Sequence, residues 1–431
     1  MNSTTPWLSV LVAQQTEPDQ DNHFLKKLLD QLIDYPGNPN VTQLVCVSVY
    51  ALPPTLEKHL DGQLRIRRVN GDLVSLILEL RDHRFTLVKE LPLKAADFCN
   101  PKHMLGMFRF IRDNYPYKRL LLSTWDHGSA FGIFNKTDKR LKVHGELHQV
   151  FTLQRVLKGL RNTPHIAKPH CLGMEGLARA IRGSFGKADV LLLRNCFMQL
   201  FDTGYTLHDA ARYLVAFEGT MYFWTYDTDV LLGALGKGTG PEGVKAICAA
   251  AVKSFDVHNP YKNIRAQTGL FANDLSRYPA LDVLIEDMTR ILLTLKNRKK
   301  DILACRATCS DLAAATDPGQ FQLVDAHRWF NQAGRMLLPQ HREYQRALNS
   351  FNKTLRKTVI DSFVGDQIGE GQFGASGFSL YFPSSLDDLG FNRSFYKLYY
   401  DRDSLYRSRF SRKSVWDAFI HFVFLDAPDK G

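Results

Sequence analysis

The sequence lacks any apolar run long enough to cross a membrane. A bilayer span needs about 18 or more consecutive apolar residues, and no stretch of the 431 residues approaches that length. The first fifteen residues, MNSTTPWLSVLVAQQ, carry no positive charge ahead of a short apolar run, which predicts a first strand and not a signal peptide. We therefore expect no membrane contact and a cytoplasmic location.

Cysteine is scarce and has no metal-binding or disulfide pattern. The chain holds seven cysteines, an odd number at irregular spacing and with no CxxC pair. This usage argues against a disulfide framework and for thiols in a reducing compartment. Most of these thiols should be inert core residues, so at most one or two can carry chemistry.

Acidic residues are fewer than basic ones, with 44 Asp and Glu against 55 Lys and Arg, for a net charge of +11. A basic excess is one mark of nucleic-acid binding. Here the excess is scattered in short clusters, such as Lys296 to Lys300 and Arg407 to Lys413. Neither cluster is typical of a helix that enters a groove, so a nucleic-acid partner is not expected.

Apolar segments typical of strands alternate with segments of helical periodicity in the first half of the chain. This alternation predicts an α/β fold with a mostly parallel central sheet, covered by helices on both faces. A hairpin is also expected between Leu73 and Leu91. The other predicted strands are Trp7–Gln14, Val41–Tyr50, Arg119–Trp125, Ala188–Asn195 and Tyr213–Gly219, and the predicted helices are His23–Tyr35, His103–Tyr115 and Glu175–Gly183.

The pattern changes after the glycine-rich stretch Leu235–Gly243. Long helices are predicted at Pro241–Phe255, Ala280–Lys296 and Glu343–Val364, with one late strand at Ser376–Pro383. We place a boundary near residue 240, which divides the chain into domains 1–240 and 241–431.

Two of the predicted strands end in residues that can carry chemistry, one in Asp126-His127-Gly128 and the other in Arg194-Asn195-Cys196. The carboxyl ends of parallel strands meet at one edge of a sheet, where active sites gather. A cysteine attacks as a thiolate and needs a base, which a histidine supplies. A glycine after that histidine lets the backbone approach closely and aim its N–H at an oxyanion. His127, Gly128 and Cys196 are therefore the candidate catalytic set.

The motifs around these strand ends resemble the clostripain family of cysteine peptidases. LLLSTWDHGSAFG (Leu120–Gly132) is similar to the family's Trp-Asp-His-Gly strand end, and DVLLLRNCFMQLFDTGYTL (Asp189–Leu207) to its nucleophile segment. Residues Tyr213–Leu235 and Gly374–Ser385 are similar to later segments of the family, in the same order. The resemblance implies a caspase-like three-layer sandwich in residues 1–240 and a mainly helical accessory domain in 241–431. It also implies a cysteine endopeptidase with a His127–Cys196 dyad that acts on a protein or peptide.

The residue two positions before the cysteine departs from the pattern of relatives that cut after Arg or Lys. Those relatives carry an acidic residue there, whereas this chain has Arg194. An arginine disfavours a basic substrate side chain and suits a carboxylate. If Arg194 pairs internally with Glu218 or Asp189, the pocket is neutral or apolar instead. Glu218 and Asp126 join Arg194 as candidate substrate-binding residues, and Asp126 is given no role in a triad.

Activation and cofactors are less constrained by the sequence. Residues 134–170 form a polar, basic linker that is a candidate for self-cleavage, with an activating partner as the alternative. No metal site is predicted, because His144 and His148 have no evident third ligand, and the GEGQFG run precedes a strand where a dinucleotide motif would follow one. No cofactor is expected, although some relatives respond to calcium. The alternative to an enzyme is a catalytically silent scaffold that binds peptides.

Overall fold

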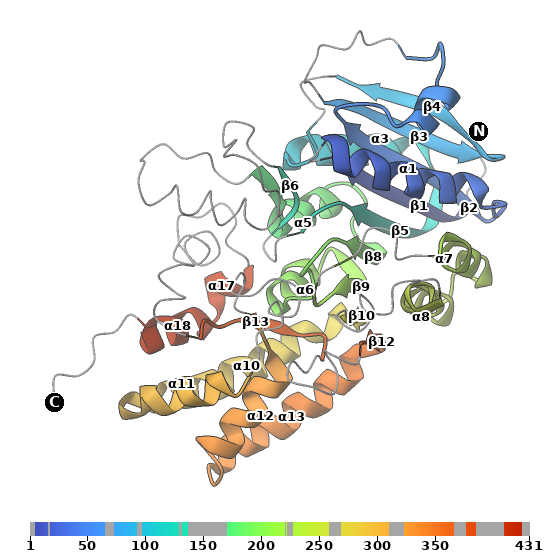
Figure 1. Cartoon of the computed structure of the whole chain (residues 1–431). Helices are drawn as coiled ribbons and strands as arrows, with labels where there is room; N and C mark the ends of the chain where they lie inside the picture. Colours follow the sequence, from blue (N-terminus) through green and yellow to red (C-terminus); the bar gives the residue numbers. More distant parts are fainter. Residues whose placement is uncertain are drawn as a thin grey trace, which may run out of the picture.

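A computed structural model represents the chain (Figure 1). It describes residues 5–15, 18–64, 73–92, 97–128, 132–136, 170–219, 221, 227–257, 269–309, 323–365, 376–384 and 409–424. Most of the linker predicted to be cleaved, the His144 and His148 pair and the GEGQFG run lie outside the described residues.

A nine-stranded sheet forms the centre of the fold, in the order β12-β10-β9-β8-β5-β1-β2-β3-β4. Its five middle strands are parallel to one another, and the two strands at each end are antiparallel to their neighbours. The predicted α/β class with a parallel core is confirmed. The strands are β1 (Thr5–Gln14), β2 (Val41–Val49), β3 (Val74–Arg81), β4 (Arg84–Leu91), β5 (Tyr117–Trp125), β8 (Ala188–Arg194), β9 (Ala211–Phe217), β10 (Gly269–Asp274) and β12 (Val359–Val364).

Helices cover both faces of this sheet and bury its alternating apolar side chains. One core joins Leu121 and Val190 with apolar residues of α1 (Pro18–Asp34), α7 (Thr228–Ala234) and α8 (Pro241–Val257). The other core joins Leu120, Leu122, Leu191 and Leu193 with α3 (Pro101–Asn114), α5 (Met174–Arg182) and α6 (Phe201–Leu207). Strands buried on both faces need continuous apolar sequence, which is why these runs could be predicted.

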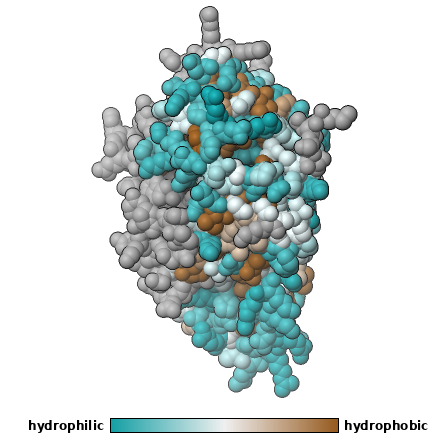
Figure 2. All heavy atoms as spheres, turned by 90° about the vertical axis from the view of Figure 1, so that its right-hand side faces the viewer, coloured by the Kyte–Doolittle hydropathy of each residue, from teal (hydrophilic) through white to brown (hydrophobic). Residues whose placement is uncertain are grey.

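The second core extends into a layer of C-terminal helices, drawn in yellow to red in the lower part of Figure 1. These helices are α10 (Tyr278–Leu293), α11 (Lys299–Ala307), α12 (Ala326–Met336), α13 (Arg342–Thr358), α17 (Arg409–Lys413) and α18 (Trp416–Phe424). A two-stranded sheet of β11 (Leu323–Asp325) and β13 (Ser379–Tyr381) lies among them. The helical end presents a hydrophilic surface (Figure 2). On α13, Arg342, Arg346 and Lys353 are exposed.

The central sheet includes strands from beyond residue 240. β10 pairs with β9, and β12 pairs with β10, so both belong to the sheet that carries the predicted catalytic residues. The division into domains 1–240 and 241–431 stays a prediction.

The helix predicted over Glu343–Val364 is wrong in its last part. α13 ends at Thr358, and Val359–Val364 is the edge strand β12. The segment VIDSFV is rich in β-branched residues, which favour a strand when a sheet edge is available. Because that edge, β10, comes from a strand that the sequence analysis did not predict, the competition between helix and strand was not visible in the sequence.

Cys196 differs from the other cysteines in its exposure. All seven cysteines lie in the described part of the chain, and six are buried whereas Cys196 is half-buried. Within the described ranges, no helix combines the length and the apolar character that a membrane span requires.

Candidate active site

The two predicted catalytic segments follow neighbouring parallel strands. β5 pairs with β8, and the last pair in register is Trp125 with Arg194. Two residues further along each strand come His127 and Cys196. The sheet therefore brings both residues to the same edge, as expected for the carboxyl ends of parallel strands.

Gly128 lies directly against the backbone of Cys196. A Cβ atom built on Gly128 would come within 2.3 Å of the Cys196 carbonyl oxygen and 2.8 Å of its nitrogen. No side chain fits at that distance, so only glycine permits this approach. The backbone after His127 is held from its other side as well, because the Phe134 N–H donates to the His127 carbonyl at 3.0 Å and Gly128 forms a β-bridge with Ile133.

Asn195, to which the sequence analysis gave no role, ties the two strand ends together. Its side-chain amide donates to the carbonyls of Asp126 at 2.8 Å and of His127 at 3.3 Å, and its amide oxygen accepts from the Thr124 hydroxyl. The side chain is fully buried. The sequence did hold a signal for this role, since Asn195 is a polar amide between an apolar strand and the candidate nucleophile. A buried amide must find hydrogen-bond partners, so a tie to a neighbouring segment could have been predicted.

The Cys196 thiol contacts backbone groups of Met221 and Gly128. The Met221 N–H donates to Sγ at 3.3 Å, and the thiol lies 3.6 Å from the Met221 carbonyl. Burial raises the pKa of this thiol to about 11, while the N–H groups of Met221 and Gly128 lower it. The geometry thus holds a neutral thiol, whose proton must be removed before it can attack a carbonyl.

The backbone is strained in both segments that meet at this edge of the sheet, the one after β5 and the one after β8. Asp126 has φ of 146° and Phe197 has φ of 57°, values that are rare for residues other than glycine. The Phe197 N–H donates to the Gly219 carbonyl at 2.9 Å, so the end of β9 helps to hold the turn that presents Cys196. Strained residues of this kind persist only where the surroundings over-determine them, and they cluster at active sites.

Asp126 and Arg194 are both buried at this edge of the sheet. An Asp126 carboxylate oxygen lies 3.7 Å from Nε2 of His127. By strand alternation, Arg194 points to the same face as Trp125, its partner in register on β5. This is the face covered by α1, α7 and α8.

The two carboxylates considered as internal partners of Arg194 bind elsewhere. Asp189, at the start of β8, accepts hydrogen bonds from the Arg119 guanidinium at 2.7 Å and the Leu120 N–H at 2.9 Å. Glu218 is buried and accepts from the Gly377 N–H at 2.9 Å and the Ser379 hydroxyl at 2.8 Å. The substrate-binding role predicted for Asp126, Arg194 and Glu218 stays a prediction.

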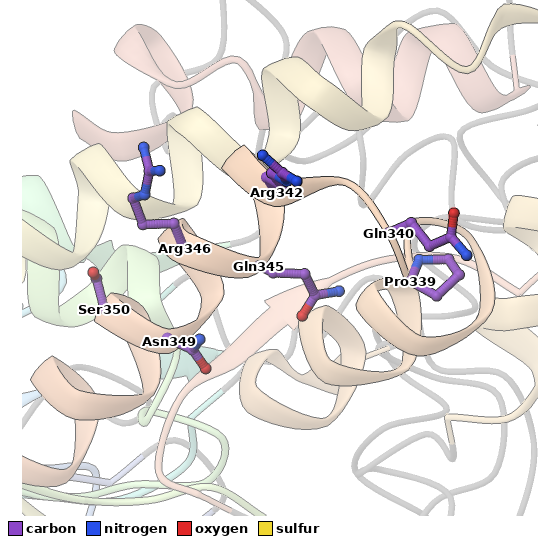
Figure 3. A pocket seen from close by; sticks show the side chains of 7 residues that line it. All are labelled: Pro339, Gln340, Arg342, Gln345, Arg346, Asn349 and Ser350. Atoms are coloured by element: carbon purple, nitrogen blue, oxygen red, sulfur yellow. The ribbon is translucent and has the colours of Figure 1, made fainter.

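A hollow of about 500 Å³ lies on α13, far along the chain from the catalytic segments. Figure 3 shows its lining side chains, among them Arg342, Arg346 and Gln345. None of the predicted site residues lines it. Across the ranges that the structure describes, no three His, Cys, Asp or Glu side chains are grouped as metal ligands would be.

Comparison with known proteins places this arrangement in one family. The model of the clostripain family matches residues 76–422. A comparison of the sequence with curated proteins found no match.

Solved structures of C11 cysteine proteases share the fold over almost the whole chain. A secreted C11 cysteine protease from Bacteroides thetaiotaomicron, iotapain, has a TM-score of 0.58 at 11% identity, covering 97% of this chain and 100% of that one. The inactive zymogen of a C11 protease from Parabacteroides distasonis has a TM-score of 0.59 at 14% identity, covering 92% and 97%. The secreted Bacteroides protease in complex with an irreversible peptide inhibitor gives 0.59 at 12% identity, covering 95% and 99%. The chain therefore belongs to the clostripain family and is a cysteine peptidase with the caspase-like α/β fold of the C11 proteases.

Proposed function

We propose that this cysteine peptidase cleaves peptide bonds within a protein substrate with His127 as the base and Cys196 as the nucleophile. The observation that carries the proposal is the contact between Gly128 and the Cys196 backbone, which joins the His-Gly segment to the cysteine at one edge of the sheet. The exposure of residue Cys196 supports it, since Cys196 is half-buried and the other six cysteines are buried.

The chemistry follows from these positions. His127 takes the proton of the Cys196 thiol, and the thiolate attacks the substrate carbonyl carbon. The backbone N–H groups of Gly128 and Cys196 stabilise the resulting oxyanion. His127 then returns the proton to the leaving amine as the C–N bond breaks, which leaves a thioester on Cys196. Water, deprotonated by His127, hydrolyses the thioester and restores the thiol. The raised pKa of Cys196 favours this general-base route over a resting thiolate.

Arg194 sets the preference for the substrate residue before the cut bond in this proposal. A buried guanidinium two positions before the nucleophile suits an Asp or Glu side chain, and excludes Lys and Arg by charge. The alternative is a preference for neutral or apolar side chains, which applies if the Arg194 guanidinium is paired with groups inside the protein.

Maturation by self-cleavage is part of the proposal. The strands β6 (Gly132–Lys136) and β7 (His170–Gly173) pair with each other and flank the basic linker. β6 begins four residues after Gly128 and is bridged to it through Ile133, so β6 lies beside the His127-Gly128 segment. Asp138 and Glu146 are the candidate cleavage positions if the preference is acidic. The Parabacteroides relative is itself described as a zymogen.

The test is cleavage of a diverse peptide mixture, read by mass spectrometry, with wild type and the Cys196→Ala and His127→Ala variants. Wild-type cuts that vanish in both variants and persist in Cys248→Ala, a buried cysteine control, support the dyad. Cuts that survive in Cys196→Ala refute it. Reactions with calcium and with a chelator, run in parallel, test the expectation that no cofactor is needed.

The identity of the residue before each cut tests Arg194. Arg194→Glu should shift the preference toward Lys and Arg, whereas Arg179→Glu, on the exposed side of α5, should leave it unchanged. Wild-type cleavage only after Lys or Arg would contradict the proposed preference.

A further inference from the structure

The turn that carries Cys196 is fixed first by the end of β9. The Phe197 N–H donates to the Gly219 carbonyl, and the Gln199 N–H donates to the Phe217 carbonyl, both at 2.9 Å. These two bonds lie on either side of Glu218. Any movement of the Glu218 backbone is therefore transmitted to the residues that follow the nucleophile.

The same turn is fixed a second time by a segment far along the chain, residues 376–379. The Gln199 side chain donates to the Gly377 carbonyl at 3.2 Å, and the Ser379 N–H donates to the Gln199 carbonyl at 3.2 Å. Gly377 has φ of 81°, and a Cβ there would lie 2.6 Å from the Phe271 ring. Segment 376–379 is therefore packed closely on Phe271 and hydrogen-bonded to Gln199 of the nucleophile turn.

Two buried carboxylates hold segment 376–379 in place. One oxygen of Glu218 accepts from the Gly377 N–H at 2.9 Å and the other accepts from the Ser379 hydroxyl at 2.8 Å. An Asp325 oxygen accepts both the N–H and the hydroxyl of Ser376 at 2.6 Å. Glu218 thus lies between the end of β9 and segment 376–379, the two parts of the chain that hold the turn. Its backbone belongs to the first, and its side chain binds the second.

Charges around this pair make the grip sensitive to ionisation. Burial, and then the neighbouring charge of Asp325, raise the pKa of Glu218 well above its ordinary range. Burial also raises the pKa of Asp325, which is opposed by hydrogen bonds from Ser376 and Arg328 and by the charge of His327 at the start of α12. Tyr278, at the start of α10, is close enough to Glu218 to respond to its charge: burial, and then the charge of Glu218, raise the pKa of the Tyr278 hydroxyl.

We propose that Glu218 is a positioning residue for Cys196, which acts by clamping residues 376–379 against the nucleophile turn. This role differs from the substrate-binding role that the sequence analysis predicted for Glu218. It rests on the proposed function, because Cys196 must be the nucleophile. Burial, and then the charge of Asp325, disfavour the ionised form of Glu218, whereas the hydrogen bonds that Ser379, Gly377 and Phe378 donate to it favour that form. Because the pKa is raised on balance, ionisation weakens the clamp.

The clamp predicts a specific division of kinetic effects. Glu218→Ala removes both acceptors and should lower kcat by about 30-fold or more, with KM changed less than about 3-fold, because a shifted nucleophile is misplaced for attack while substrate contacts remain. Glu218→Gln keeps the shape and an acceptor, and should retain kcat within about 3-fold of wild type near pH 7. Asp361→Asn, on the edge strand β12, is the matched control and should be silent.

The pH profile separates positioning from a merely structural role. As pH rises through its raised pKa, Glu218 ionises, so wild-type kcat should fall on the alkaline side while Glu218→Gln, which cannot ionise, keeps its activity to higher pH. Alkylation of Cys196 by iodoacetamide, followed by mass spectrometry, gives the same comparison without a substrate. The two proposals fail on different results. Cleavage that persists in Cys196→Ala refutes the dyad, whereas the clamp is refuted by the kinetics and alkylation rates of the Glu218 variants.

Three results would overturn the clamp. The first is a kcat and an alkylation rate in Glu218→Ala equal to those of wild type. The second is a Glu218→Ala variant in which only KM changes, and the third is a Glu218→Gln variant whose activity falls at the same alkaline pH as that of wild type. The loss confined to KM would restore the substrate-binding role. If Glu218→Ala does not fold, Ser379→Ala removes the side-chain hydroxyl that donates to Glu218 and should show the same kcat effect in smaller degree.

Discussion

Replacement of Gly128 by alanine tests the contact on which the site is built. The added Cβ would lie 2.3 Å from the Cys196 carbonyl oxygen, where ordinary contacts begin at 3.4 Å. The two strand ends must then separate by about 1 Å, because both partners are backbone atoms that cannot rotate away.

The expected cost has two parts. Overpacking of this kind lowers the free energy of unfolding by about 1–3 kcal/mol. A displacement of about 1 Å at a catalytic site lowers activity by about 100-fold, which is about 2.7 kcal/mol of transition-state stabilisation. Gly128→Ala should therefore unfold at a lower temperature and also lose about two orders of magnitude in kcat/KM on a cleavable peptide.

The assay compares thermal unfolding and kcat/KM of Gly128→Ala with those of Gly106→Ala. Gly106 is an exposed glycine in the interior of α3, and a Cβ there meets nothing within 4 Å. Gly106→Ala should keep full activity and gain up to about 1 kcal/mol, because alanine has the higher helix propensity. Wild-type kcat/KM in Gly128→Ala would refute the reasoning, since it would mean that the His-Gly segment does not fix the position of Cys196.

Three further substitutions have outcomes that the structure determines. Asn195→Ala removes a fully buried amide that binds three partners, and should lower the free energy of unfolding by about 2–4 kcal/mol in chemical denaturation; a change within about 0.5 kcal/mol would contradict its role as a tie. Gly377→Ala combines a positive φ with a Cβ 2.6 Å from the Phe271 ring, so both the melting temperature and the peptidase activity should fall, and a fall in neither would contradict the fit of segment 376–379. Asp209→Asn weakens the ion pairs with Arg182 and Arg409, which lower the pKa of the Asp209 carboxyl despite its partial burial. Because the pKa of Asp209 is lowered in the folded state, the ion pairs stabilise the fold at neutral pH, and this stabilisation is lost as pH falls through the folded-state pKa. The variant should therefore be about 0.5–1 kcal/mol less stable than wild type at pH 7, a value reduced for solvent screening. In strong acid the two proteins should be equally stable.

The local features of the site were open to prediction because they depend on short stretches of chain. The apolar runs before Asp126 and before Arg194 have the continuous character of strands buried on both faces, and both form strands. Parallel strands deliver their carboxyl ends to one edge, which brings His127 and Cys196 to the same place without any knowledge of packing.

The sequence by itself determined the α/β class, the parallel core and the pair of strand ends where the chemistry is predicted. Only the tertiary structure decided what holds them there. The fit of Gly128 against Cys196, the bonds of Asn195 to the neighbouring strand end and the grip of Glu218 on Gly377 join segments far apart in the chain. Periodicity and propensity act over a few residues, whereas these contacts depend on strand register and close packing between distant segments, which no short stretch of sequence encodes.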